Sequence, residues 1–154
     1  MTGPTPTGQD EARRALADRP YDLGALGDLA RRIDVATGAD RCLDVRILAA
    51  TEQAGQWSPA DIEHACDNPE RTCSPPHYTS SVDAALKLFR KALPGWAYAL
   101  DECHLDIHAW VCPDDGRPSN GYEGWGESMP LAILAATVEA LCALAQQAKG
   151  EGDA

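Results

Sequence analysis

Apolar residues recur every three to four positions in several stretches of the chain, which is the spacing of an amphipathic helix. The clearest stretch is 78–96, with the sequence YTSSVDAALKLFRKALPGW. Ser80 fits a helix N-cap and Pro94 a helix stop, so a helix is predicted between them. Its apolar face consists of Val82, Ala85, Leu86, Phe89 and Leu93.

Further helices follow from similar patterns on either side of this stretch. Residues 22–50 contain two apolar periodic runs separated by Gly38, and a short helix is predicted within residues 59–66. A last helix is predicted from Pro130 to Gly150. Its apolar residues lie on more than one side, which indicates cover by several elements or a subunit contact.

An alternation of apolar and polar residues predicts two antiparallel strands, residues 95–100 and 105–112, joined by a polar turn. Alternate residues of the second strand point to opposite faces. The core face holds Leu105, Ile107, Ala109 and Val111, and the other face holds His104, Asp106, His108, Trp110 and Cys112. Residues 117–125 are predicted to add an edge strand or a glycine-rich loop, because Pro118 disfavours a central position.

Separate helical and strand segments predict an α+β fold. At 154 residues, 44% of them hydrophobic, the chain fits one domain, which we expect to span residues 21–149. Residues 1–20 are expected to form a disordered tail and residues 150–154 a frayed end. Residues 51–77 lack apolar periodicity and are rich in proline, so they are expected to form a long irregular insert.

The charge balance is acidic, with 24 Asp and Glu against 13 Lys and Arg and a net charge of −11. This balance argues against nucleic-acid or anionic-membrane binding and leaves a basic partner open. With no basic leader and no run of ~20 apolar residues, a cytoplasmic protein is expected. In that compartment cysteines stay reduced, so all six are expected to be thiols or metal ligands before disulfides: Cys42, Cys66, Cys73, Cys103, Cys112 and Cys142.

Three segments together resemble the phage ABA sandwich domain family. They are Tyr78–Leu86 with its Leu-Pro-Gly-Trp exit, Leu29–Ala50, and the run Gly-Glu-Ser-Met-Pro-Leu-Ala that begins at Gly126. The resemblance implies an α-β-α layered sandwich with a small, mainly antiparallel sheet of two to four strands and about four helices. It also implies a phage or prophage protein in the host cytoplasm, from a family without an established general activity.

Four residues within the proline-rich insert are candidate zinc ligands. His64, Cys66, Cys73 and His77 are the nitrogen and sulfur donors that tetrahedral zinc prefers. Their spacing departs from the usual pairs of cysteines two to four residues apart, and the family resemblance brings no metal site with it. Four unconnected loop side chains are the competing interpretation.

A second candidate is His104, Asp106 and His108, which alternate along one strand face near Cys112. Two imidazoles beside a carboxylate can bind a metal or act as acid and base, as in a metal-dependent hydrolase. A half-exposed polar strand face is the simpler interpretation. The chain also contains no nucleophile elbow, phosphate loop, zinc-protease helix or dinucleotide fingerprint.

The third candidate is aromatic and lies along the second strand and the residues after it. Flat rings beside hydrogen-bonding groups can hold a planar ligand such as a nucleobase, and an arginine can meet its phosphate. The candidate ligand-binding residues are Tyr78, His108, Trp110, Arg117, Asn120, Tyr122 and Trp125. Packing of the same rings into the core is the alternative.

These observations favour a non-enzymatic phage or prophage binding protein that acts on a small ligand or a host protein. One form is a counter-defence protein that sequesters a nucleotide-type signal. The alternatives are the metal-dependent hydrolase and a structural or assembly accessory protein, for which the wide apolar surface of the last helix suggests a homo-oligomer.

Overall fold

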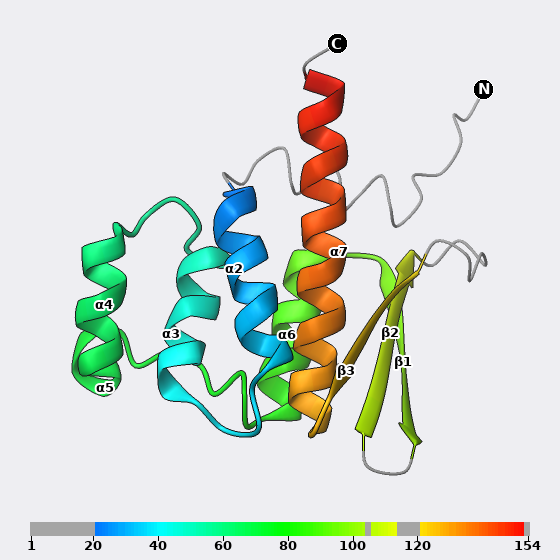
Figure 1. Cartoon of the computed structure of the whole chain (residues 1–154), viewed down its shortest axis with the longest axis horizontal. Helices are drawn as coiled ribbons and strands as arrows, with labels where there is room; N and C mark the ends of the chain where they lie inside the picture. Colours follow the sequence, from blue (N-terminus) through cyan, green and yellow to red (C-terminus); the bar gives the residue numbers. More distant parts are fainter. Residues whose placement is uncertain (1–20, 104–105, 114–120, 153–154) are drawn as a thin grey trace.

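The computed structural model of the chain describes residues 21–103, 106–113 and 121–152 (Figure 1). This part of the chain holds six helices and three strands. The helices are α2 (Leu23–Asp34), α3 (Arg41–Ala50), α4 (Pro59–Asp67), α5 (Pro69–Thr72), α6 (Val82–Ala92) and α7 (Met129–Gly152). The strands are β1 (Trp96–Cys103), β2 (Asp106–Pro113) and β3 (Tyr122–Gly126). The predicted tail of residues 1–20 lies outside the described residues.

The helix starts follow from capping side chains. The Asp40 carboxylate accepts from the Leu43 amide at 3.1 Å and so begins α3. The predicted cap of α6 at Ser80 is wrong by one residue, because the Ser81 hydroxyl accepts from the Ala84 amide at 3.2 Å. The apolar face predicted for α6 is confirmed, since its residues are buried in the core except for the half-buried Val82.

The three strands form one antiparallel sheet in the order β1-β2-β3. β3 is thus the edge strand predicted near residues 117–125. The alternation predicted for β2 is confirmed for residues 106–111, whereas Cys112, predicted on the outer face, is buried. Ala109 and Val111 are buried on the inner face, whereas Asp106, His108 and Trp110 belong to the opposite face.

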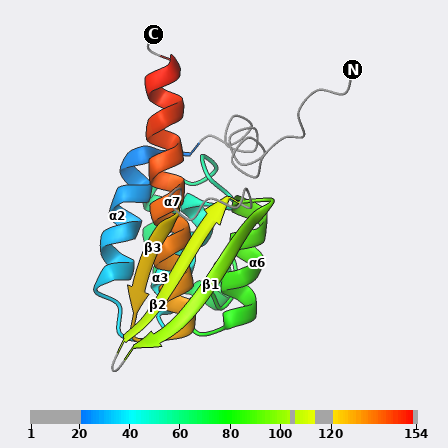
Figure 2. The same cartoon turned by 90° about the vertical axis from the view of Figure 1, so that its right-hand side faces the viewer.

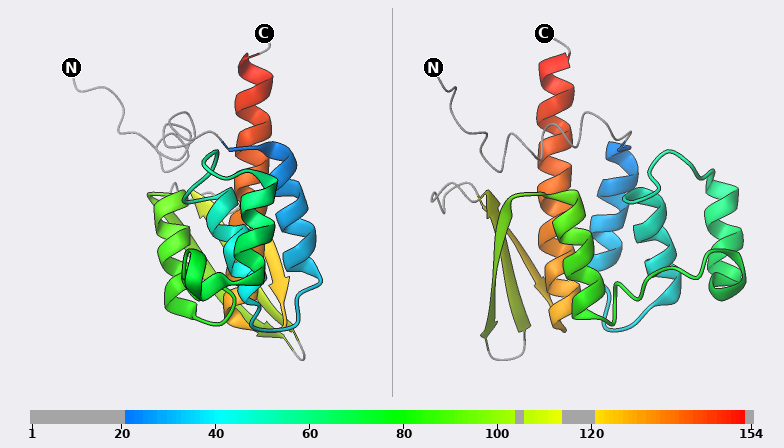
Figure 3. Two further views of the ribbon diagram at one scale, coloured as in Figure 1. Left: turned by 90° about the vertical axis from the view of Figure 1, so that its left-hand side faces the viewer. Right: turned by 180° about the vertical axis from the view of Figure 1, so that it is seen from behind.

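The described helices all lie on one side of the sheet (Figures 1 and 2). α6 and α7 form the layer next to the sheet, α2 and α3 come next, and α4 and α5 lie outermost (Figure 3). The predicted α+β layered fold with a small antiparallel sheet is therefore confirmed. In these residues the sheet is an outer layer, whereas the α-β-α expectation placed it between helices.

α7 is the central element of the core. It packs against α2, α6, β2 and β3, and most of its first four turns are buried. Its residues Met129–Gly150 are long and apolar enough to cross a membrane, but 61% of that window is buried inside this fold. The wide apolar surface that suggested a subunit contact is therefore covered by elements of the same chain. The helix also continues through Gly150, which does not end it as predicted.

β3 reaches α7 closely because it carries glycines where the two elements touch. A Cβ atom on Gly124 would lie 2.2 Å from the Ala136 amide nitrogen, and one on Gly126 would lie 2.7 Å from the Ala132 nitrogen. Both positions face the helix in the register of the sheet, opposite Ala109 and Ile107. The close packing of strand on helix thus requires residues without a side chain.

The predicted irregular insert, residues 51–77, contains two helices, α4 and α5. A disulfide between Cys42 and Cys66 joins α4 to α3, so the expectation of reduced thiols is wrong for these two cysteines. A capping box starts α4. The Ser58 hydroxyl accepts a hydrogen bond from the Asp61 amide, and the Asp61 carboxylate accepts one from the Ser58 amide. The short helix predicted within residues 59–66 is thus confirmed as α4, whereas α5 was not predicted.

Candidate functional site

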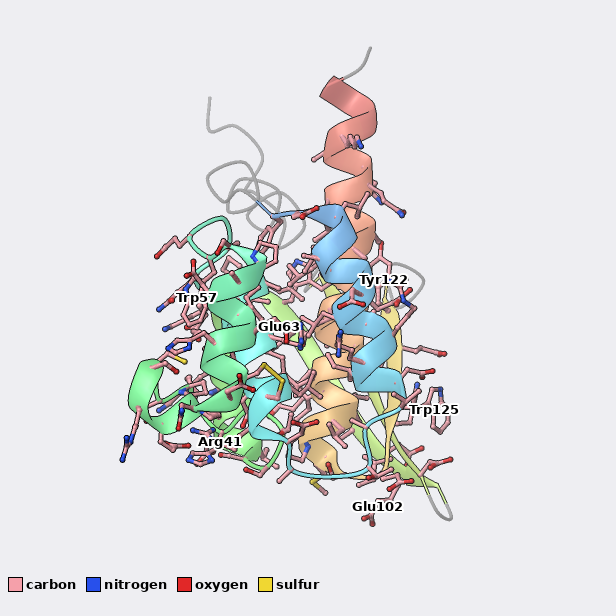
Figure 4. All side chains as sticks on the ribbon, turned by 60° about the vertical axis from the view of Figure 1, so that its left-hand side comes forward. Arg41, Trp57, Glu63, Glu102, Tyr122 and Trp125 are labelled. Atoms are coloured by element: carbon pink, nitrogen blue, oxygen red, sulfur yellow. A yellow bond between two sulfur atoms is a disulfide. The ribbon has the colours of Figure 1, made fainter. Side chains whose placement is uncertain are left out.

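Three of the predicted ligand-binding residues meet on the outer face of the sheet, the face that the described helices leave uncovered. His108 and Trp110 come from β2, and Trp125 comes from the edge strand β3. The rings of His108 and Trp125 lie 4.4 Å apart between centroids and are tilted by 30°. Trp125 keeps half of its surface exposed and projects away from the helices (Figure 4). Its indole is thus available for contact from one side.

Trp110 is partly buried, and the residue that precedes β3 explains why. A Cβ atom on Gly121 would lie 2.2 Å from the Trp110 indole nitrogen, so the glycine lets the ring lie directly against the backbone. Trp110 pairs with Ala99 on one side and Glu123 on the other. The Trp110 ring thus packs closely against the backbone at Gly121.

Carboxylates alternate with the rings on this face. Asp101 pairs with His108 across β1 and β2, Glu123 pairs with Trp110 across β2 and β3, and Asp106 lies on the same face. The His108 Nε2 atom is 3.7 Å from the Glu123 Oε1 atom, which is an ion-pair distance only when the imidazole is protonated. As described, the three strands carry no Lys or Arg. The face is therefore both aromatic and negatively charged.

We refer to His108, Trp110, Trp125, Asp101, Asp106 and Glu123 as the aromatic–acidic face. Sequence reasoning missed Asp101 and Glu123, because it did not fix the strand pairing that places them beside the rings. The signal available was the alternation in β3, where Glu123 and Trp125 must share a face. Without the strand register, the sequence does not show which residues of β2 pair with Asp101 and Glu123.

Two other predicted ligand-binding residues lie elsewhere. Tyr122 points to the inner face of the sheet and stacks on Trp96, with 6.1 Å between ring centroids. Tyr78 is 1% exposed, and its hydroxyl donates to the Glu52 carboxylate. Burial, reinforced by this carboxylate, raises the pKa of Tyr78 well above its usual value. These two tyrosines are packing residues, as the alternative interpretation had it.

The remaining two predicted residues, Arg117 and Asn120, lie outside the described residues, and so does His104 of the proposed hydrolase face. The other members of that face, Asp106 and His108, are on the outer side of β2 as predicted. Of the five predicted ligand-binding residues that the structure describes, three are brought together: His108, Trp110 and Trp125.

The predicted zinc ligands are not brought together. Cys66 is bonded to Cys42, and His64 and His77 are exposed side chains of α4 and of the segment before α6. Cys73 is half-buried, with its sulfur 3.9 Å from the Pro69 carbonyl oxygen. Among the residues that the structure describes, no group of three or more His, Cys, Asp or Glu could hold a metal ion.

Comparisons of this chain with protein-family models, curated proteins and solved structures found no match. The resemblance to the phage ABA sandwich domain family therefore stays a prediction from the sequence motifs.

Proposed function

We propose that this chain is a non-enzymatic binding protein whose aromatic–acidic face holds a basic segment of a partner protein. The observation that carries the proposal is the half-exposed Trp125 ring, which lies against the His108 ring with carboxylates around the pair. Tryptophan is enriched among the residues that contribute most to the binding energy of protein interfaces. The surrounding carboxylates select a positively charged group.

An arginine of the partner meets both features of this face. Its planar guanidinium can stack on the Trp125 indole, a contact that contributes roughly 0.5–1 kcal/mol when exposed and more when desolvated. The same group can donate to Asp101 or Glu123 in a charge-assisted pair. The net charge of −11 adds long-range attraction and raises the association rate of a basic partner.

A nucleotide-type signal fits this face less well than a basic protein. Its phosphates would approach Asp101, Asp106 and Glu123, and like charges at close range oppose binding. Of the two ligand classes that the sequence left open, the described geometry favours the protein partner. This preference applies to the outer face of the sheet.

The setting that we propose is a phage or prophage protein in the host cytoplasm that blocks a basic host protein. Support for this setting comes from the three sequence motifs that resemble the phage family. An assembly role through α7 was suggested by the wide apolar surface of that helix. This argument no longer applies, because β2, β3, α2 and α6 pack against α7. The binding role is thus carried by the sheet face alone.

The experiment measures the dissociation constant of a hexa-arginine peptide by isothermal titration calorimetry, at low and at physiological salt concentration. Trp125→Ala should weaken binding about five-fold, the loss expected for one cation–π contact. Asp101→Asn should also weaken it, whereas the matched control Asp34→Asn, at the exposed end of α2, should not. A hexalysine peptide should bind less tightly, because ammonium groups do not stack on rings as guanidinium does.

The competing explanation is diffuse attraction between a cationic peptide and an acidic protein. In that case Trp125→Ala would bind hexa-arginine as the wild type does, and Asp101→Asn and Asp34→Asn would have equal effects. Either result would refute the assignment of this face. Circular dichroism of each variant confirms that the fold is retained.

A further inference from the structure

Strand β1 forms one edge of the sheet, and among the described residues it has a strand neighbour on one side alone. All eight of its residues pair with β2, in a continuous register without a bulge. Figure 2 shows β1 at the margin of the sheet, and of the described elements β2 alone packs against it along its length. Most of the strand is accordingly open to solvent. Its exposed residues are Ala97, Tyr98, Ala99, Asp101 and Glu102.

An edge strand presents the N–H and C=O groups of alternate residues away from its sheet. In the described part of the chain, residues 97–102 make no backbone hydrogen bond beyond those of the sheet itself. We refer to the side of residues 97–102 that faces away from β2 as the free edge of β1. Its backbone groups are a template for one further strand.

Edge strands usually carry a feature that prevents such pairing, such as a lysine, a proline, a bulge or a very short length. The opposite edge has one of these features, since β3 is five residues long. β1 has eight residues, no bulge, and no lysine, arginine or proline in the sequence WAYALDEC. The free edge of β1 is therefore the unprotected edge of this sheet.

On the outer side of the sheet, the free edge is continuous with the aromatic–acidic face. Ala99 pairs with Trp110, and Asp101 pairs with His108. Neighbouring strands are only ~4.8 Å apart, so a long side chain on a strand added beside Ala99 can lie across this small residue toward the Trp110 ring. A basic side chain beside Asp101 gains a charge-assisted hydrogen bond. The outer side of the edge therefore selects basic residues.

On the inner side of the sheet, the edge leaves apolar surface uncovered. Tyr98 is 40% exposed, and its ring packs edge-on against Phe89 of α6, with 5.7 Å between ring centroids. Leu100 lies on the same side and is half-buried. Apolar side chains of an added strand would cover this surface. Because side chains alternate between the two faces of a strand, a segment of alternating basic and apolar residues fits both sides.

We propose that an extended segment of a partner protein, with alternating basic and apolar residues, pairs with the free edge of β1 as a fourth strand. Its main chain bonds to residues 97–102, its basic residues lie beside the aromatic–acidic face, and its apolar residues cover Tyr98 and Leu100. This inference rests on the function proposed for that face and adds how the partner's backbone is held. A second copy of this chain fits less well, because each copy has a net charge of −11.

The test compares two peptides, each a fourfold repeat of Arg-Val, which matches the eight residues of β1. In the second peptide every backbone nitrogen is methylated, so it keeps the charge and the side chains but cannot donate backbone hydrogen bonds. Isothermal titration calorimetry should show that the methylated peptide binds roughly ten-fold more weakly or worse, because several hydrogen bonds are lost together. By NMR, the amide protons of alternate residues within 97–102 should exchange more slowly when the unmodified peptide is bound.

Tyr98→Lys tests the inner side of the edge. An added strand would bury the new ammonium group without a partner, so this variant should bind the unmodified peptide about five-fold more weakly or worse. The matched control is Val35→Lys, which makes the same change of charge at a residue of α2's C-terminus that is 76% exposed. It should leave binding nearly unchanged. Circular dichroism of both variants confirms that the fold is retained.

Equal binding of the two peptides, or equal effects of the two lysine variants, would overturn the added strand. If Trp125→Ala still weakened binding in that case, the function proposed for the aromatic–acidic face would stand without it. Two further results would assign the edge to another occupant and so overturn the proposal. One is slow exchange of every amide proton of residues 97–102 in the free protein, and the other is a dimer in sedimentation that the peptide dissociates.

Discussion

The contact between β3 and α7 makes Gly124→Ala the sharpest test of this fold. Gly124 is buried at the point where the strand crosses the helix. A Cβ atom there would lie 2.2 Å from the Ala136 nitrogen, 2.6 Å from the Ala132 oxygen and 2.8 Å from the Ala135 carbonyl carbon. All three are backbone atoms of α7, so no flexible side chain can move aside.

The strand and the helix must therefore separate until the closest of these contacts reaches the 3.4 Å at which ordinary packing begins. Overpacking of this kind usually costs about 1–3 kcal/mol, and a clash with backbone belongs at the upper end. Alanine regains roughly 0.5–1 kcal/mol, because glycine loses more conformational entropy in a strand. The net loss in the free energy of unfolding is about 2 kcal/mol, which lowers the melting temperature by about 4–8 °C.

Thermal and urea denaturation followed by circular dichroism measure this loss. The matched control is Gly38→Ala, because a Cβ atom at Gly38 meets no atom within 4 Å. That substitution should be neutral or stabilise the protein by about 0.4–1 kcal/mol. If Gly124→Ala unfolds at the same temperature and urea concentration as Gly38→Ala, the close approach of β3 to α7 is refuted.

Two further predictions concern the helical side of the molecule. The Cys42–Cys66 disulfide closes a loop with a sequence separation of 24, so its removal in a Cys42→Ser, Cys66→Ser variant should cost about 3.5 kcal/mol of unfolding free energy. Urea denaturation checks this, and a wild-type midpoint that a phosphine reductant leaves unchanged would show that the bond contributes nothing. Burial and the Glu52 carboxylate raise the pKa of Tyr78, so its stabilisation is fully present below about pH 10 and falls as the pH rises above that value. Tyr78→Phe should therefore lose less stability than the wild type between pH 9 and pH 11, and parallel urea midpoints for the two proteins across that range would contradict the reasoning.

Local patterns in the sequence predicted much of the secondary structure. The apolar spacing of α6 and the alternation of β2 predicted the buried residues of both elements, because each pattern depends only on backbone periodicity. Cap positions were less certain. Ser80 and Ser81 both have the right chemistry, and the tertiary fold selects the second one.

The candidate site was predicted in part for the same reason. Alternation placed His108 and Trp110 on one face of β2, which the structure confirms. Tyr122 and Trp125 were grouped because they are close in sequence, yet an odd separation sends them to opposite faces of β3. The strand register, which brings Asp101 and Glu123 beside the rings, depends on pairing between strands.

The sequence by itself thus determined the helices α2, α3, α4, α6 and α7, the strands β1 and β2, and the apolar side of α6. Only the tertiary structure decided what these elements contact. It surrounds α7 with elements of the same chain, brings Cys42 to Cys66, and opens a cleft beside Trp57. The physical reason is that periodicity is a local property of the backbone, whereas contacts between distant residues depend on how all the elements pack at once.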